Sequence, residues 1–233
     1  MLSALDDSVS EASRIARGLE GHVVVGCISS VAYSILPQAI ARFRADYPDV
    51  RISLRDGEGP SVIDALQTQD VEFAVTTYAE QPPDMVGEFL LKDQFVAVCG
   101  MEHALVRTDE ITWNTLSKQR LVGFRAPSSS RRVLDAALEM RGIELTWFDE
   151  VDQLSSLIGF LQSGHFVGVI PELLTPYVPG VKTFRIVGDV VYREIHLLRR
   201  KDTPLSASAL ALWNCVLASA PGEVDAVSLS TPE

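Results

Sequence analysis

Two clusters of serines stand where helices are expected to begin, and a helix start can bind an anion. The first backbone N–H groups of a helix have no partner within it and carry about half a positive charge. Serine hydroxyls at the same place can cap the helix and complete a small anion site. Facing each other across a cleft, the two clusters would clamp a carboxylate, whereas each alone is more simply a helix cap. The clusters are Ser29 and Ser30, and Ser128, Ser129 and Ser130.

Motifs of the common enzyme classes do not occur in the sequence. There is no GxSxG, no GxGxxG after a strand, no GxxxxGK and no HExxH. The four histidines are scattered, and the three cysteines are far apart without CxxC spacing, which favours neither a disulfide framework nor a zinc site. Arg131 and Arg132 would pair with an acidic ligand or, more simply, form a solvated helix start. We therefore expect no catalysis, no cofactor and no metal.

The charge balance argues against direct DNA binding by this chain. Acidic residues outnumber basic ones by 31 to 20, a formal charge of −11, whereas a domain that holds a phosphate backbone usually has a basic excess. The 47% hydrophobic content is enough for a substantial core. Neither a secretory signal nor a membrane-spanning run is present, so we expect a soluble, cytoplasmic protein without membrane contact.

Strands and helices are predicted to alternate along the first half of the chain. A Val-rich run at residues 22–28 predicts a buried strand, and periodic apolar residues predict one helix over residues 31–47. Such alternation is typical of an open parallel sheet covered by helices. The further elements expected here are strands at residues 50–54, 71–76 and 89–99 and a helix at residues 61–68.

The second half predicts another lobe of the same kind and a return to the first. Its expected elements are strands at residues 121–124, 147–151, 166–170 and 181–186, a helix at residues 131–141 and another ending near Gly164. A strand at residues 194–199 and a helix at residues 205–219 then lead back. The predicted fold is α/β, with two Rossmann-like lobes joined by two crossover strands: lobe I spans 21–98 and 197–220, and lobe II spans 99–196. A hinged cleft is expected at the carboxyl ends of both sheets.

The first twenty residues predict an N-terminal linker helix. Their apolar residues recur at alternating spacings of three and four, the seam of a coiled coil, and indicate a homo-oligomer, either a dimer or a tetramer. Two alternatives are an amphipathic helix packed on its own domain and a frayed terminus. Residues 221–233 are expected to form a solvated tail. The seam residues are Leu2, Leu5, Val9, Ala12, Ala16 and Leu19.

Four segments together resemble the effector-binding domain of LysR-type bacterial transcriptional regulators. They are GHVVVGCISSVAYSILPQAIARFRADYPDVRISL, ALQTQDVEFAV, LVGF and LQSGHFVGVIPELL, in the usual order, and the resemblance covers roughly residues 21–218. Two departures are Glu72, where the family usually has Asp, and the residues 164–168, which replace the commoner Gly-Leu-Gly run. Neither departure removes a ligand-binding group that we can identify.

The resemblance implies a type II periplasmic-binding-protein fold that follows a linker helix and a winged helix-turn-helix. We interpret Met1 as the start of a shortened protein, or of a natural protein that has lost its DNA-binding domain. DNA would then be bound only through a domain absent from this chain. Thr77 and Phe124 match family positions that line the effector pocket, although Thr77 is otherwise an ordinary turn residue and Phe124 an ordinary core aromatic.

Three classes of function are compatible with this reading. The first is the sensing domain of a regulator, with a small-molecule effector, expected to be a carboxylate, bound by Ser29, Ser30, Thr77, Phe124, Ser128 and Ser129. The second is the solute-binding protein of a transport system, which normally needs an export signal or lipid anchor. The third is an enzyme on the same two-lobed architecture, which needs a nucleophile, base or cofactor lysine in the cleft. Fold alone does not separate the three.

Overall fold

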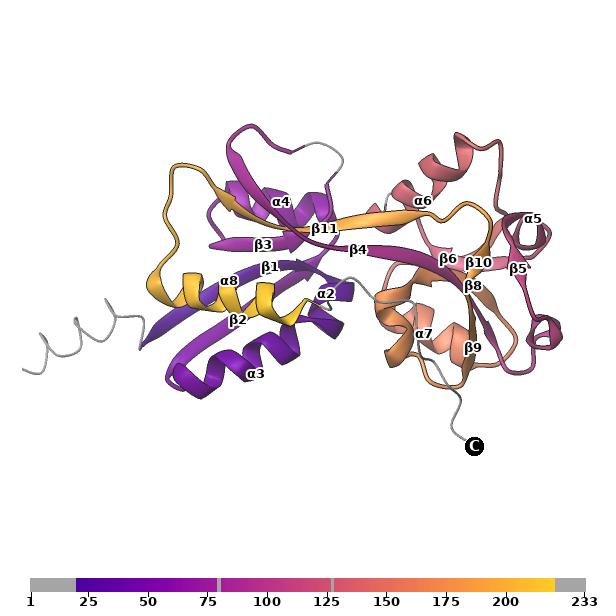
Figure 1. Cartoon of the computed structure of the whole chain (residues 1–233), viewed down its shortest axis with the longest axis horizontal. Helices are drawn as coiled ribbons and strands as arrows, with labels where there is room; N and C mark the ends of the chain where they lie inside the picture. The colour runs from indigo at the N-terminus through magenta and orange to yellow at the C-terminus, as the bar shows by residue number, and fades with distance from the viewer. Residues whose placement is uncertain (1–19, 79–80, 127, 221–233) are drawn as a thin grey trace, which may run out of the picture.

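Two α/β lobes lie side by side and are joined by two long strands in the computed structural model (Figure 1). The structure describes residues 20–78, 81–126 and 128–220, so the predicted linker helix and C-terminal tail lie outside it. The joining strands are β4 (Met85–Gly100) and β11 (Tyr192–Arg200), which pair antiparallel with each other. The predicted two-lobed α/β fold is confirmed.

The sheet of lobe I is mixed, which corrects the prediction of an all-parallel sheet. Its strand order is β2-β1-β3-β11-β4. β1 pairs parallel with β2 and β3, whereas β11 pairs antiparallel with β3 and β4. β11 enters from the opposite lobe and needs no crossover helix, so nothing in the local sequence forces it to be parallel. The remaining strands are β1 (Gly21–Ile28), β2 (Val50–Gly57) and β3 (Phe73–Thr76).

Proline divides the first predicted helix into two. The structure has α2 (Ser29–Ser34) and α3 (Leu36–Asp46) in place of one helix over residues 31–47. Pro37 lies in the first turn of α3, where a proline is well tolerated because its missing N–H has no role there. The remaining helices of lobe I are α4 (Gly59–Gln67) and α8 (Ala207–Ser219).

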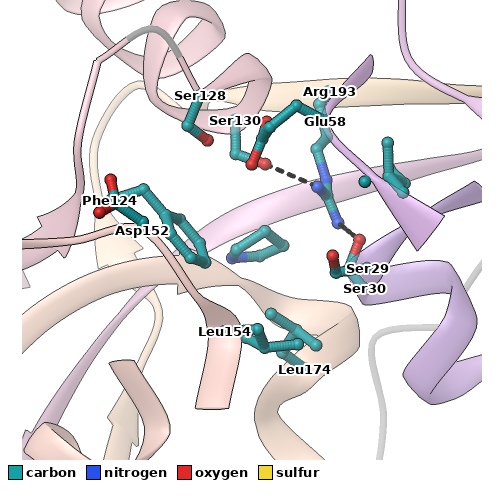
Figure 2. Close-up of a pocket in the computed structure, with 13 residues that line it drawn as sticks. Ser29, Ser30, Glu58, Phe124, Ser128, Ser130, Asp152, Leu154, Leu174 and Arg193 are labelled. Atoms are coloured by element: carbon teal, nitrogen blue, oxygen red, sulfur yellow. Dashed lines mark hydrogen bonds between the residues drawn. The ribbon is translucent and has the colours of Figure 1, made fainter. Parts of the chain in front are cut away.

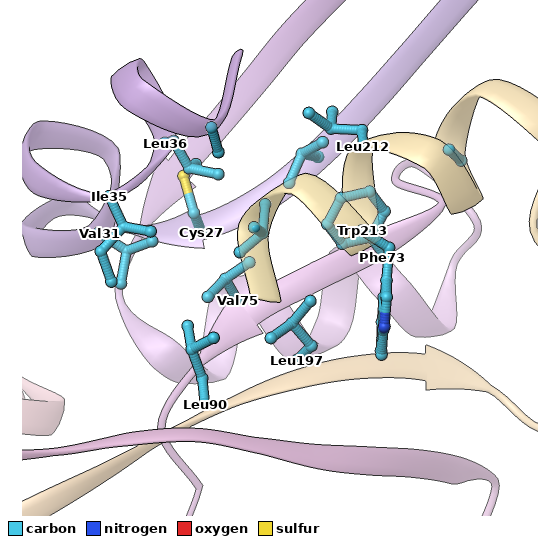
Figure 3. Close-up of a cluster of buried hydrophobic side chains, with 14 of the residues drawn as sticks. Cys27, Val31, Ile35, Leu36, Phe73, Val75, Leu90, Leu197, Leu212 and Trp213 are labelled. Atoms are coloured by element: carbon cyan, nitrogen blue, oxygen red, sulfur yellow. The ribbon is translucent and has the colours of Figure 1, made fainter. Parts of the chain in front are cut away.

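The core of lobe I joins residues from both ends of the described chain (Figure 3). α8 packs against α3 and β1, and the ring of Trp213 meets the edge of Phe73 with centroids 5.5 Å apart. Cys27, Leu197 and Leu212 are fully buried in the same cluster. Lobe I therefore depends on a helix that follows lobe II in the sequence.

Lobe II continues the sheet in the order β4-β8-β6-β7, with β9 also paired to β4. The predicted strand over residues 181–186 is interrupted at Arg185, and its last part pairs with a separate short strand. The strands are β6 (Leu121–Phe124), β7 (Trp147–Val151), β8 (Val167–Pro171), β9 (Val181–Phe184), β5 (Ile111–Thr112) and β10 (Ile186–Val187). The helices are α5 (Trp113–Leu116), α6 (Ser129–Glu139) and α7 (Leu154–Gln162), with 3-10 turns η1 (Ala104–Arg107) and η2 (Glu172–Tyr177).

The joining strands change partners between the lobes. β4 pairs with β11 as far as Gln94 and with β8 from Phe95 onward, before the lobe boundary predicted at residues 98 and 99. β11 begins at Tyr192, before the boundary predicted at residues 196 and 197. In the part of the chain that the structure describes, no helix has the length and apolar character needed to cross a membrane.

Candidate binding site between the lobes

A cavity lies between the lobes, at the place where the parallel strands of both lobes end. Residues at or just after the ends of β1, β2, β6, β7 and β8 line it, and the empty space between them, counted together with open solvent, is about 410 Å³. The carboxyl ends of parallel strands are where open α/β sheets usually bind ligands. Its polar lining consists of Ser29, Ser30, Glu58, Ser128, Ser130, Asp152 and Arg193 (Figure 2).

Arg193 ties the lobes together beside this cavity. Its guanidinium donates to the Asp93 carboxylate over 2.7 and 2.9 Å, and both side chains are 2% exposed. The same guanidinium donates to the hydroxyl of Ser30 at the start of α2 and to that of Ser130 in α6, each over 2.8 Å. Asp93 also accepts from the backbone N–H of Leu173 over 3.0 Å. The positive charge of Arg193 is therefore already compensated within the protein.

Glu58 and Gly59 make a second contact between the lobes. The carboxylate of Glu58, just before α4, accepts from the backbone N–H of Ser129 over 2.9 Å. The N–H of Gly59 donates to the Ser129 hydroxyl over 3.0 Å. A Cβ on Gly59 would lie 2.6 Å from that hydroxyl and 3.2 Å from the carbonyl oxygen of Thr77, so only glycine allows this approach.

Four of the six residues predicted to bind a ligand line the cavity. These are Ser29, Ser30, Phe124 and Ser128. Thr77 is buried beside the contact between the two helix starts, and the Ser129 hydroxyl forms that contact, so both side chains lie behind the lining. Ser29 and Ser128 have hydroxyls that make no hydrogen bond within the described residues.

One known protein family matches the chain over the whole range that the structure describes. Residues 16–221 match the model of the LysR substrate binding domain. The chain belongs to this family. It is 29% identical over 217 residues to the HTH-type transcriptional regulator YfeR of Shigella flexneri, which covers 93% of this chain and 70% of YfeR. It is 25% identical over 191 residues to YbhD of Escherichia coli, covering 81% of this chain and 60% of YbhD.

Solved structures of effector-binding domains share the fold. The effector-binding domain of QuiR in complex with shikimate superposes with a TM-score of 0.76 at 21% identity, over 86% of this chain and 97% of that one. The BenM effector-binding domain with its effector benzoate gives 0.72 at 16% identity, over 84% and 90%. The expectation of a type II periplasmic-binding-protein fold is thereby confirmed.

The serines of this LysR-type domain do not cap their helices as predicted. Ile28 occupies the cap position of α2, and Ser29 and Ser30 are already helical, where a side chain does not reach the first-turn N–H groups. Ser128 occupies the cap position of α6, but its hydroxyl makes no capping hydrogen bond. The hydroxyls of Ser29, Ser30 and Ser128 lie at the cavity (Figure 2), where they are available to groups outside their own helices.

Arg131 is not the solvated helix start that the sequence favoured. Its side chain is 12% exposed and pairs with Asp135 over 2.6 Å and Glu150 over 3.1 Å. Its guanidinium also lies 4.2 Å from the ring centroid of Trp147. Asp152, just after the end of β7, pairs with Arg125 over 3.4 Å. Arg131 therefore joins α6 to β7 within lobe II.

The three cysteine thiols of the described chain all have raised pKa values. Burial, with a smaller contribution from Asp56, raises the pKa of the Cys27 thiol to about 12, and burial also raises the pKa of Cys99 and Cys215. Thiols with raised pKa values are poor nucleophiles because the thiolate is the reactive form. Among the described residues, no group of three metal-ligating side chains comes together. The cavity offers hydroxyls, carboxylates and one paired guanidinium, a set suited to recognising a polar molecule.

Sequence reasoning missed Arg193, Asp93 and Glu58. Arg193 and Ile195 alternate with exposed residues along β11, so Arg193 occupies an inward position of the strand. A charged residue at an inward position was the signal that could have predicted a buried ion pair. Its partner Asp93 lies one hundred residues earlier, and that pairing follows from strand topology alone.

Proposed function

We propose that this chain is the ligand-sensing domain of a LysR-type transcriptional regulator and binds a small carboxylate between its lobes. The observation that carries the proposal is the cavity itself, lined from both lobes and bordered by the start of α6. Ser29, Ser30, Phe124 and Ser128 would contact the effector, and Ser129 and Thr77 would complete the site from behind. The shikimate bound by QuiR and the benzoate bound by BenM are both carboxylates, which supports this class of ligand.

The activity of the whole regulator extends this proposal. YfeR and YbhD are HTH-type regulators, and the chain spans 70% and 60% of their lengths. We propose that DNA is bound through a helix-turn-helix outside this chain, in the cytoplasm, by a homo-oligomer. Regulatory relatives favour this function over a transport protein or an enzyme, and ligand binding would act without chemical change to the ligand.

A thermal-shift screen against a panel of carboxylic acids tests the ligand class. An effector at about one hundred times its dissociation constant stabilises the fold by about 2.7 kcal/mol, or about 5–10 °C for a chain of this size. The amide analogue is expected to give a much smaller shift. If no acid in a broad panel shifts the melting temperature, the carboxylate class is wrong.

Replacing Ser29 and Ser128 together with alanine separates binding from stability. Each hydrogen bond to a charged group is worth about 1.5–3 kcal/mol, so the ligand-induced shift is expected to fall sharply. The unliganded melting temperature should change little, because neither hydroxyl bonds within the described residues. Ser163→Ala, on an exposed helix end away from the cavity, is the control and should keep the full shift. A full shift in the double variant would place the ligand elsewhere.

A further inference from the structure

Glu58 places a protein carboxylate at the start of α6. It belongs to lobe I, yet its Oε2 atom accepts from the backbone N–H of Ser129 in lobe II over 2.9 Å. α6 runs for eleven residues, and an anion is favoured at a helix start because the N–H groups there are unpaired and the helix dipole is positive. This carboxylate therefore has the chemistry that an acidic ligand would bring to the same place.

A second group at this position lacks a partner. Ser128 is 7% exposed, lines the cavity, and its hydroxyl makes no hydrogen bond within the described residues. Figure 2 shows this hydroxyl directed toward the interior of the cavity. The rest of Ser128 is buried while its unpaired hydroxyl borders the open space of the cavity, so a ligand bound there would be its partner.

The alternative cation in the cavity is already engaged. Arg193 donates to Asp93, Ser30 and Ser130, and only 3% of it is exposed. An acid group bound there would take the place of the Ser30 or Ser130 hydroxyl and would share with Asp93 a positive charge that is already compensated. The start of α6 is therefore the more accessible place for a ligand carboxylate.

We propose that Glu58 is an internal competitor of the effector. The effector carboxylate takes the place of the Glu58 carboxylate at the Ser129 N–H and gains the Ser128 hydroxyl. The inference rests on the proposed function for its ligand class. Displacement removes one of the two bonds between the starts of α4 and α6 and leaves only the bond from Gly59 to the Ser129 hydroxyl. Glu58 thus sets both the apparent affinity and the contact between lobes that ligand binding changes.

Acetate is the probe for this competition, because it carries a carboxylate and almost nothing else. Glu58→Ala empties the position, and acetate at about five times its dissociation constant is expected to raise the melting temperature of the variant by about 2–4 °C. The wild type should respond much less, because Glu58 already holds the position. Glu110→Ala, which removes an exposed carboxylate with the same change in charge, should respond like the wild type. Acetamide and sodium chloride at matched ionic strength control for the solvent.

A second variant covers the case in which Glu58→Ala does not fold. Glu58→Gln keeps the shape and a weak acceptor but loses the charge, so acetate should still stabilise it more than the wild type. Equal responses to acetate in all variants, or no response in any, would overturn the inference.

A separate measurement distinguishes failure of the proposed carboxylate effector from failure of the proposed role of Glu58. An acid that shifts the wild type in the carboxylate panel should bind Glu58→Gln about tenfold more tightly, because its competitor has lost its charge. If that acid binds both proteins equally, the carboxylate effector stands and the role of Glu58 fails. If acetate raises the melting temperature of Glu58→Ala but no acid of the panel raises that of the wild type or the variant, the start of α6 binds an anion and the proposed effector class is wrong.

Discussion

At the scale of single residues, the buried pair of Arg193 and Asp93 has the largest expected effect on stability. Replacing Arg193 with methionine leaves the Asp93 carboxylate buried without its cation. The free energy of unfolding is expected to fall by about 3–5 kcal/mol, measured by urea denaturation. Lys92→Ala is the matched control, because Lys92 and Glu194 form an exposed pair over 3.6 Å that contributes about 1 kcal/mol or less. Similar losses in the two variants would contradict this role.

His196 makes stability depend on pH. Burial lowers its pKa, against a smaller opposite effect of Glu194, and its Nδ1 atom is buried without a partner among the described residues. The unfolded chain therefore binds a proton at a higher pH than the folded protein does. Stability is full above the ordinary histidine pKa of about 6.5 and decreases as the pH falls toward the lower folded value.

Replacing His196 with phenylalanine tests this dependence. Tyr78 and Phe89 already pack on the imidazole, with ring centroids 4.5 and 5.7 Å away, so an aromatic side chain suits the position. The variant is expected to lose less stability than the wild type between pH 7 and pH 5 in urea titrations. Parallel curves for the two proteins would assign the acid sensitivity to other groups.

The residue types at the site were readable from the sequence, but their bonds were not. The serine clusters identified the two helix starts, and four of six predicted residues line the cavity. The predicted caps are absent because Ser29 and Ser30 lie one and two positions past the cap of α2, and because the Ser128 hydroxyl makes no capping hydrogen bond at α6. Glu58 was missed because its partner Ser129 lies on the opposite lobe. Arg193 was missed because its partner Asp93 lies on the neighbouring strand β4, one hundred residues earlier in the chain.

At the scale of elements, the close approach of α4 to α6 depends on the missing side chain of Gly59. Glycine to alanine normally favours a helix, but here the added Cβ would meet the Ser129 hydroxyl at 2.6 Å. Gly59→Ala is therefore expected to lower the free energy of unfolding by about 1–3 kcal/mol. Gly159→Ala is the matched control within α7, where nothing lies within 4 Å, and it should stabilise by about 0.5–1 kcal/mol. The same sign for both variants in urea denaturation would refute this account.

Most elements were predictable from local patterns, whereas strand direction was not. The Val-rich run at residues 22–28 forms the buried strand β1, and the alternation of strands with helices fixed the class of fold. The prediction of an all-parallel sheet in lobe I was wrong at β11. The chain enters β11 from lobe II, and this path makes β11 antiparallel to β3. The prediction of one helix over residues 31–47 was wrong. The apolar periodicity continues across the break near Pro37, so the pattern does not reveal that two helices meet there.

At the scale of the whole molecule, we expect self-association. Apolar residues recur at heptad spacing from Leu2 to Leu19, a sequence pattern that predicts the seam of a coiled coil. Sedimentation at micromolar concentration is expected to give a dimer or a larger oligomer. A chain lacking residues 1–19 is the control and should associate more weakly. A 25.5 kDa monomer at every accessible concentration would contradict the expectation.

Because the chain returns to lobe I, the two lobes are expected to complete their folding in a different order from that of their synthesis. A ribosome releases the strands of lobe II before it has synthesised β11 and α8, yet β3 needs β11 as its neighbour and Phe73 needs Trp213. Pairings between such distant parts of a chain form late, whereas a continuous stretch folds as it emerges. Lobe I is begun first and completed last. During translation the edge of β3 stays unpaired until β11 is synthesised, so we expect chaperones to bind the incomplete sheet of lobe I.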